Sequence, residues 1–480
     1  MIAVTTKTVA PLTGSVGSPA ALVGRLPLPV MIYLASVVIQ IQVQLGPILM
    51  TNLRLILIVM MVPMAARLFS GNFGKVNLVD ILFISHSMWM LVAIGVNNPT
   101  RAIESVGSTS VEFLGGYLLG RTYIRDKETF IATIKFIITM VIFSLPFAIQ
   151  EALTGVALIP KLISSIPGLD SVNQVDIAKR MGLERVQNTF AHPIHYGLFV
   201  SSAVSFSLIG LKGVIRESRR IFSIITAAVC IFLSLSSGAL LSGVLQAGLC
   251  AWAWVFRNVK TRWWIFMGLL AVAYVAVDLM SNRSPIKVLM SYATFSTHNA
   301  YYRSIIFEWG MMNVWQNPIF GLGFRDWIRP WYMRSGTMDN FWLVMAVRYG
   351  IPGFLLIASG YLFALIKVGR RDLSADPVIV RLRLAWMITF LGLSFTLCTV
   401  HIWTSAYSYV FFLLGAGLWM ADTQINTLAV AQAPQESLRP PVRYSRGFSP
   451  ASATRTVAQK SENGQSRGEI RFSRFPTSDT

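Results

Sequence analysis

Long apolar segments alternate with short polar turns along most of the chain. A helix of about 20 predominantly apolar residues is long enough to cross a lipid bilayer. We therefore predict an all-α protein, a polytopic membrane helix bundle of about twelve transmembrane helices. The predicted spans are residues 28–45, 54–69, 78–96, 105–120, 131–150, 193–210, 221–236, 238–256, 264–280, 350–367, 384–401 and 405–421.

The amino-acid composition agrees with this pattern. Of the 480 residues, 54% are hydrophobic and 13% are charged, whereas a soluble domain carries about 25% charged residues. The three cysteines, Cys230, Cys250 and Cys398, all lie within apolar runs. They show neither a disulfide framework nor metal-site spacing, so we interpret them as small apolar side chains.

Lysines and arginines are distributed unequally between alternate loops. With the N-terminus in the cytoplasm, the short external loops hold only Arg101, with Arg54 at a boundary. Because basic loops stay inside, both termini are predicted to be cytoplasmic. The net charge of +20 then reflects topology, and we expect no nucleic-acid partner. The short inside loops hold Lys75, Arg121, Arg125, Lys127, Lys212, Arg216, Arg219, Arg220, Arg257, Lys260, Arg262, Lys367, Arg370, Arg371, Arg381 and Arg383.

The composition also divides the chain into three parts. Residues 1–27 form a cytoplasmic N-terminal segment, and the first apolar run is expected to remain as a signal anchor. Residues 28–421 form the transmembrane domain, with large external loops, including short helices, at about 151–192 and 281–349. Residues 422–480 are rich in Pro, Ser, Gln and Arg, which predicts a disordered cytoplasmic tail.

The two external loops carry many basic residues that the topology does not explain. As a set they suggest an anion-binding surface on the extracytoplasmic side, and the alternative is ordinary solvated loop charge. The first loop carries Lys179, Arg180 and Arg185; the second carries Arg283, Lys287, Arg303, Arg325, Arg329 and Arg334.

The richest stretch is Asn317–Trp327, followed by Met338–Leu343. Gly321 and Gly323 allow tight backbone turns. The aromatic side chains nearby could stack on sugar rings, although aromatic residues are also common at the membrane surface. These side chains are Phe320, Phe324, Trp327 and Trp331.

Glu112 is an ionisable residue inside the fourth predicted span. An intramembrane carboxylate is costly and is therefore a candidate functional group. The structural alternative is a hydrogen bond or ion pair within the bundle, with His86 or with an arginine near the outer surface. The glycines close to it, Gly115, Gly116 and Gly120, are typical of closely packed membrane helices.

Three local patterns occur in order along the chain. Together they resemble the O-antigen ligase and polymerase superfamily of bacterial membrane glycosyltransferases, over about residues 30–421. The first is Arg185–Gly197 and the second is Leu233–Ala239. The third combines Tyr302–Arg303, Asn317–Gly323, Asp339–Leu343 and Tyr349–Gly353.

The chain departs from the usual superfamily pattern at four positions. Asn188 replaces a glycine, Ile194 an asparagine, Ser237 an arginine and Asp339 a histidine. The changes at Ser237 and Asp339 favour a polymerase over a ligase.

The resemblance implies transfer of a glycan from an undecaprenyl-pyrophosphate carrier to a hydroxyl acceptor. It implies a bacterial inner-membrane protein whose active site faces the periplasm. The first choice is polymerisation of lipid-linked repeat units into exopolysaccharide or O-antigen, and the second is ligation to lipid A-core. The expected partners are undecaprenyl-pyrophosphate-linked glycans and the lipid bilayer, with chain-length regulator and flippase proteins as further candidates.

A transporter of polysaccharide or lipid-linked sugar is the alternative from another class, because about twelve spans are also typical of transporters. A transporter should show related halves and charged or broken helices near the midplane. Here only Glu112 is clearly intramembrane, and the unusual residues are concentrated in the external loops.

The implied chemistry needs cations for the leaving pyrophosphate. Arginine binds phosphate oxygens with two parallel hydrogen bonds and stays protonated. The candidates are Arg185 and Arg303, with Arg325 in reserve.

The acceptor hydroxyl must also lose a proton, and Asp339 is the candidate base, with Asn340 orienting the site. The alternative for Asp339 is an N-cap of a helix that starts at Asn340. His192 and His195 are alternative bases. These two histidines have no third metal ligand in view, so we expect metal-independent catalysis without a cofactor.

Overall fold

The computed structural model describes residues 25–46, 48–71, 75–282, 297–333 and 335–423. The cytoplasmic segment predicted at 1–27 and the tail predicted at 422–480 lie almost entirely outside these residues. The candidate loop cations Arg283, Lys287 and Arg334 also lie outside them.

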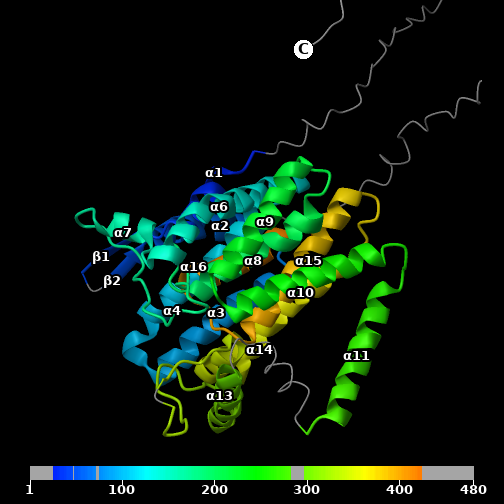
Figure 1. Ribbon diagram of the computed structural model, residues 1–480. Helices are drawn as coiled ribbons and strands as arrows, with labels where there is room; N and C mark the ends of the chain where they lie inside the picture. Colours follow the sequence, from blue (N-terminus) through cyan, green and yellow to red (C-terminus); the bar gives the residue numbers. More distant parts are fainter. Residues whose placement is uncertain (1–24, 47, 72–74, 283–296, 334, 424–480) are drawn as a thin grey trace, which may run out of the picture. The chain divides into compact units, whose positions relative to one another are not determined.

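The regular secondary structure of the described chain is almost entirely helical (Figure 1). In order, the elements are α1 (Leu28–Val38), β1 (Gln42–Leu45), β2 (Ile48–Thr51), α2 (Asn52–Phe69), α3 (Leu78–Asn97), η2 (Pro99–Arg101), α4 (Ala102–Ser110), η3 (Val111–Gly115), α5 (Gly116–Tyr123), α6 (Lys127–Thr154), α7 (Leu158–Ser164), α8 (Pro193–Ser205), η4 (Phe206–Gly210), α9 (Glu217–Leu233), α10 (Ser237–Val255), α11 (Arg262–Met280), α13 (Thr297–Gln316), α14 (Phe341–Gly369), α15 (Pro377–Leu397), α16 (Thr404–Gly417) and α17 (Trp419–Asp422).

Each predicted span contains a helix, and the all-α polytopic membrane fold is confirmed. Within the described residues, nine helices are long and apolar enough to cross a membrane. The other three predicted spans contain α1 with 11 residues, the run α4–η3–α5, and α9 with 17 residues.

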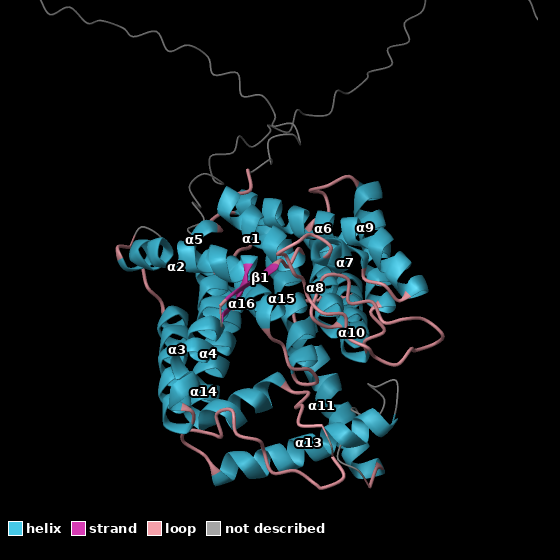
Figure 2. Cartoon of the chain, turned by 90° about the vertical axis from the view of Figure 1, so that its left-hand side faces the viewer, coloured by secondary structure: helices cyan, strands magenta, loops and turns pink. Residues whose placement is uncertain are grey.

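The predicted span 28–45 is wrong in its second half. Helix α1 ends at Val38, and Gln42–Leu45 instead pairs antiparallel with Ile48–Thr51 (magenta in Figure 2). Polar and apolar residues alternate in Gln-Val-Gln-Leu, which is the period of a strand and not of a helix. Gly46 has φ +61° at the turn between the strands, a conformation that glycine adopts without strain.

Helix α16 lies in the centre of the bundle and is buried over most of its length. It packs closely on α5, because a Cβ atom at Gly116 would lie 2.6 Å from the Ser408 carbonyl oxygen. A Cβ atom at Gly120 would lie 2.2 Å from the Phe412 carbonyl oxygen. The expected close packing at these two glycines is therefore present, as small residues allow in membrane helices.

Glu112 lies in η3, a π-helical turn between α4 and α5. Its Oε1 is 2.8 Å from Nε of Arg54 at the start of α2. His86 instead has Nδ1 2.8 Å from the Gly353 carbonyl oxygen. Of the structural partners considered for Glu112, the arginine is therefore the one in contact.

Candidate active site

A cavity of about 890 Å³ lies where the N-terminal ends of four helices, α8, α10, α14 and α16, meet α13. The segment before α8 and the segment between α13 and α14 complete its walls. Six predicted site residues line it: Arg185, His192, His195, Arg303, Arg325 and Asp339. Segments far apart in the sequence are therefore brought together as expected, whereas Glu112 and Asn340 are not among the lining residues.

The segment before α8 is held by a buried carboxylate in α6. Glu151 accepts hydrogen bonds from the backbone N–H groups of Gln187 (2.9 Å) and Asn188 (2.8 Å). Asn188 has φ +54°, in the left-handed region that glycine and asparagine tolerate best. This conformation explains why asparagine can stand where the superfamily usually has glycine.

Two arginines from this segment reach the cavity. Arg180 donates from Nη1 to the Leu235 carbonyl oxygen at 2.6 Å. Arg185 is half-buried, and its Nε has no hydrogen-bond partner among the described residues. Burial, and secondarily the charge of Arg180, lowers the pKa of Arg185 to about 10. Both side chains therefore remain cationic at neutral pH.

The turn between α9 and α10 forms the adjacent wall. Leu235 has φ +44°, a strained conformation for a bulky residue. Ser236 caps α10, and Ser237 is its first residue; both line the cavity. The positive end of the α10 dipole therefore points towards the cavity, which favours an anion there.

The opposite wall is formed where the 317–323 stretch packs against the kink of α14 at Gly350. We call this contact the interlock. Gly350 has non-helical φ/ψ angles (73°, 176°), so α14 is kinked at this residue. A Cβ atom at Gly350 would lie 1.9 Å from the Ile319 carbonyl oxygen. At the kink, the N–H of Leu322 donates to the Val347 carbonyl oxygen (2.7 Å) and that of Gly323 donates to the Arg348 carbonyl oxygen (3.0 Å). The interlock fixes the 317–327 stretch against the first half of α14.

This interlock presents two further arginines to the cavity. Arg325 is hydrogen-bonded to Oδ1 of Asn97 through Nη2 at 2.7 Å. Arg348 lies with its guanidinium carbon 5.2 Å from the ring centroid of Phe324. Arg348 was not predicted as a site residue, although a single arginine directly after the apolar run Phe341–Val347 was an available signal.

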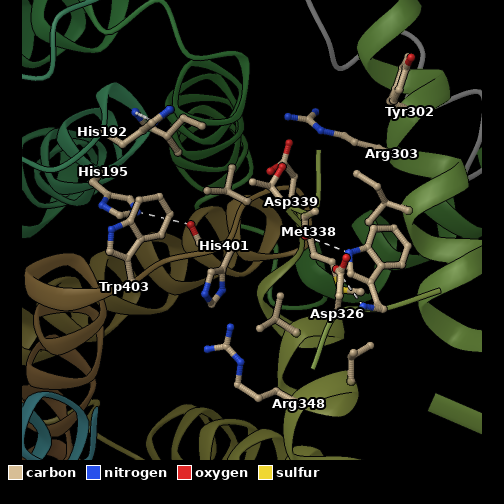
Figure 3. Close-up of a pocket in the computed structure, with 18 of the residues that line it drawn as sticks. His192, His195, Tyr302, Arg303, Asp326, Met338, Asp339, Arg348, His401 and Trp403 are labelled. Atoms are coloured by element: carbon tan, nitrogen blue, oxygen red, sulfur yellow. Dashed lines mark hydrogen bonds between the residues drawn. The ribbon is translucent and has the colours of Figure 1, made fainter. Parts of the chain in front are cut away.

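Asp339 lines the cavity just before α14. Its carboxylate and the guanidinium of Arg303 lie side by side in Figure 3. The surrounding protein displaces water and raises the pKa of Asp339, while the charge of Arg303 counteracts this rise. The N-cap of α14 is Asn340, whose Oδ1 accepts from the Leu343 N–H at 3.1 Å. The N-cap alternative for Asp339 is therefore wrong, because the helix begins at Phe341.

Three histidines meet around Trp403. Nδ1 of His192 accepts the Ile194 N–H at 3.1 Å and so caps α8. His195 is fully buried, with its ring centroid 4.1 Å from that of Trp403. Its Nε2 lies 3.4 Å from the His401 carbonyl oxygen, a contact drawn in Figure 3. His401 and Trp403 were not predicted as site residues. His401 is the last residue of the predicted span 384–401, and Trp403 lies just after it.

These rings are uncharged at neutral pH. Burial, helped by the nearby charges of Arg185 and Arg180, lowers the pKa of His192 to about 4. Burial, helped by the charge of Arg348, lowers the pKa of His401 to about 3. Within the described residues, no group of three His, Cys, Asp or Glu side chains is arranged to hold a metal ion.

Comparison with known proteins adds one finding. The family model described as O-antigen ligase matches residues 222–358. This range runs from α9 into α14 and contains Ser237, Arg303, Arg325 and Asp339. No curated protein matches the chain. The family match confirms the resemblance of this multi-pass membrane protein to the O-antigen ligase and polymerase superfamily of glycosyltransferase-type enzymes, which use lipid-linked glycans.

Proposed function

We propose that the protein polymerises undecaprenyl-pyrophosphate-linked oligosaccharide repeat units into exopolysaccharide or O-antigen. The transfer takes place on the periplasmic side of the bacterial inner membrane and needs no metal ion. The main support is the cavity, whose described lining holds five arginines but only two carboxylates, Asp326 and Asp339. Asp326 is paired with Arg329 at 2.5 Å, so Asp339 is the carboxylate available to the substrates.

The arginines bind the pyrophosphate of the donor. Negative charge grows on the leaving group as the glycosidic carbon separates from the phosphate oxygen. Fixed cations and helix N-terminal N–H groups stabilise this charge without reorganising during the reaction. Arg185 and Arg303 carry this role, and Arg325, held by Asn97, is the reserve.

Arg180 supplies the cation that the α9–α10 turn lacks. Ligases of the superfamily often have an arginine at the position of Ser237. Here Arg180 donates to the Leu235 carbonyl oxygen, two residues before Ser237. A guanidinium is therefore present at this turn although it comes from another segment.

Asp339 acts as the general base. The acceptor hydroxyl gives its proton to the Asp339 carboxylate while its oxygen forms a bond with the anomeric carbon of the donor. The bond from that carbon to the pyrophosphate oxygen breaks, and the pyrophosphate leaves on its lipid. The charge of Arg303 favours the ionised form of Asp339, which is the form that can accept the proton.

The histidines serve better as donors than as bases. Nδ1 of His192 already accepts a backbone hydrogen bond, so its proton lies on Nε2 in the neutral ring. Nε2 of His195 faces a carbonyl oxygen and is therefore also protonated. His192 can donate to a phosphate or sugar oxygen, and the buried ring of His195 supports Trp403.

The proposed orientation follows from the positions of the basic loops. Basic loops precede the N-terminal ends of α6 and α9. The C-terminal ends of the same two helices lead into segments that line the cavity. An inside position for these loops places the cavity on the periplasmic side. A flippase that delivers lipid-linked units and a chain-length regulator are the partners that this position would need.

Ligation of a finished chain to lipid A-core is the second candidate, because the matching family model is described as O-antigen ligase. Purified protein supplied with lipid-linked repeat units distinguishes the two. A ladder of products supports polymerase, and a single transfer to added lipid A-core supports ligase. Transport of the lipid-linked unit across vesicles without a change in glycan length would overturn both.

A further inference from the structure

A second cavity, of about 610 Å³, lies between α6 and the N-terminal end of α9. Helix α9 runs from this cavity to the turn that lines the first one. Its 17 residues span about 25 Å. The second cavity is therefore far from the candidate active site, at the opposite end of α9.

Three cations line the second cavity: Lys135, Arg216 and Arg219. Its described lining contains no acidic side chain. The nearest acid along α9, Glu217, is paired with Arg220. Arg220 also donates to the carbonyl oxygens of Ser207 (3.1 Å) and Leu208 (2.8 Å). Glu217 is therefore already paired with Arg220. The described lining of the second cavity carries three cations and no acid.

The position of Lys135 points to a ligand at the membrane surface. Lys135 lies eight residues after Lys127, the first residue of α6, or about 12 Å along the helix axis. A half-buried lysine at that depth can extend its amine to the headgroup region while its methylene chain lies against apolar side chains.

An exposed apolar stripe leads away from the cavity along α9. Phe222 lines the cavity and is 51% exposed. Ile221, Ile225, Val229 and Phe232 lie at helical spacing along the same helix, and all are exposed. In a membrane protein this stripe faces lipid. A ligand with an anionic head and long hydrocarbon chains would match both the cavity and the stripe.

We propose that this cavity binds an anionic phospholipid from the leaflet at this end of the bundle. The phosphate diester contacts Lys135, Arg216 and Arg219, and Ser218 can donate a hydrogen bond to it. The acyl chains lie along the α9 stripe. Basic pockets between membrane helices on the cytoplasmic side are suited to such headgroups. Lipid binding is independent of the proposed glycosyl transfer, and only the name of the leaflet rests on the proposed orientation.

The test uses full-length protein purified in mild detergent, depleted of lipid, and examined by native mass spectrometry. Phosphatidylglycerol and phosphatidylcholine of the same chain length are added in turn. The variant K135Q/R216Q/R219Q removes the lining charge. The matched control R257Q/K260Q/R370Q removes the same charge from exposed positions outside the lining.

Wild type and the control should prefer phosphatidylglycerol by at least about tenfold, and the lining variant should lose this preference. Excess inorganic phosphate should leave the preference of the wild type in place. Equal preference in all three proteins would overturn the proposal, as would equal loss in the control or displacement of the lipid by phosphate. If the triple variant does not fold, R219Q alone should reduce the preference, and an unchanged preference would contradict the proposal.

Discussion

Two of the clusters of ionisable side chains in this bundle are built differently. At one end, buried Arg121 in α5 has Nε 3.6 Å from Oδ1 of Asp80, and Nη2 3.2 Å from Oδ2 of Asp422. Asp80 also accepts the Tyr117 hydroxyl at 2.5 Å, and Lys367 pairs with Asp422 at 2.9 Å. Each of these four charged side chains lies within 4 Å of an opposite charge.

In the described lining of the first cavity, by contrast, cations exceed anions. Five arginines line it beside Asp326 and Asp339, and Asp326 is already paired with Arg329. Like charges held close together cost free energy unless an anion joins them. The comparison teaches that charge alone does not identify a site. Buried side chains of opposite charge join helices, whereas an excess of cations around a cavity is suited to an anionic ligand.

The largest expected effect is the loss of polymer formation when Asp339 becomes Asn. The amide cannot accept the acceptor proton, so turnover should fall by about 10²–10⁴-fold while the amount of protein stays normal. The matched control is D326N, which changes the other carboxylate of the same cavity. Product ladders in cells measure both, and full activity of D339N would remove Asp339 from the proposed chemistry.

E151Q should reduce glycosyl transfer less than D339N does. A single amide oxygen replaces the two carboxylate oxygens that hold the Gln187 and Asn188 N–H groups. The Arg185 segment should then be held less firmly. The KM for the lipid-linked donor should rise by about tenfold, and kcat should change less. Steady-state kinetics measure this split, with E128Q on the same helix as control. A fall in kcat with no change in KM would argue against a positioning role.

The pH profile provides a finer test of the Asp339–Arg303 pair. Displacement of water by the surrounding protein raises the pKa of Asp339, and the charge of Arg303 lowers it. A base acts when deprotonated, so activity should rise with pH through this pKa. In R303Q the lowering is lost, and the acid limb of kcat should move to higher pH. An unmoved limb in R303Q would show that another group controls it.

The smallest effect on catalysis is expected at the balanced cluster. R121Q leaves Asp80 buried without its cation, which should cost about 3–5 kcal/mol of stability. Activity per folded molecule should stay within about twofold. Thermal unfolding in detergent and normalised activity measure the two quantities. A large loss of activity in a folded R121Q would weaken the distinction between the clusters.

Much of this arrangement could be predicted from the sequence. Apolar runs identify membrane helices because the bilayer leaves few alternatives for the backbone. The unequal loop charges put the two long loops on one side, and the structure brings Arg185, Arg303 and Asp339 to one cavity. Charge pattern and span count predicted that the two loops share a side, and the superfamily resemblance pointed to these three residues.

Other features depend on backbone geometry that an apolar run does not reveal. Arg348 reaches the cavity because α14 is kinked at Gly350 and interlocked with the 317–323 stretch. His401 reaches it because α15 ends at Leu397 and the next residues form a loop. The strand at Gln42–Leu45 was hidden because its alternation is short and adjoins a helix.

The most direct test of the central claim is binding of undecaprenyl pyrophosphate to the purified protein. The unbalanced arginines should bind its pyrophosphate, so R185Q/R303Q should lower the affinity by about 10²-fold or more. R257Q/K260Q, which removes two exposed charges elsewhere, should bind as wild type does. Wild-type affinity in R185Q/R303Q would contradict the assignment of the open arginines to the pyrophosphate.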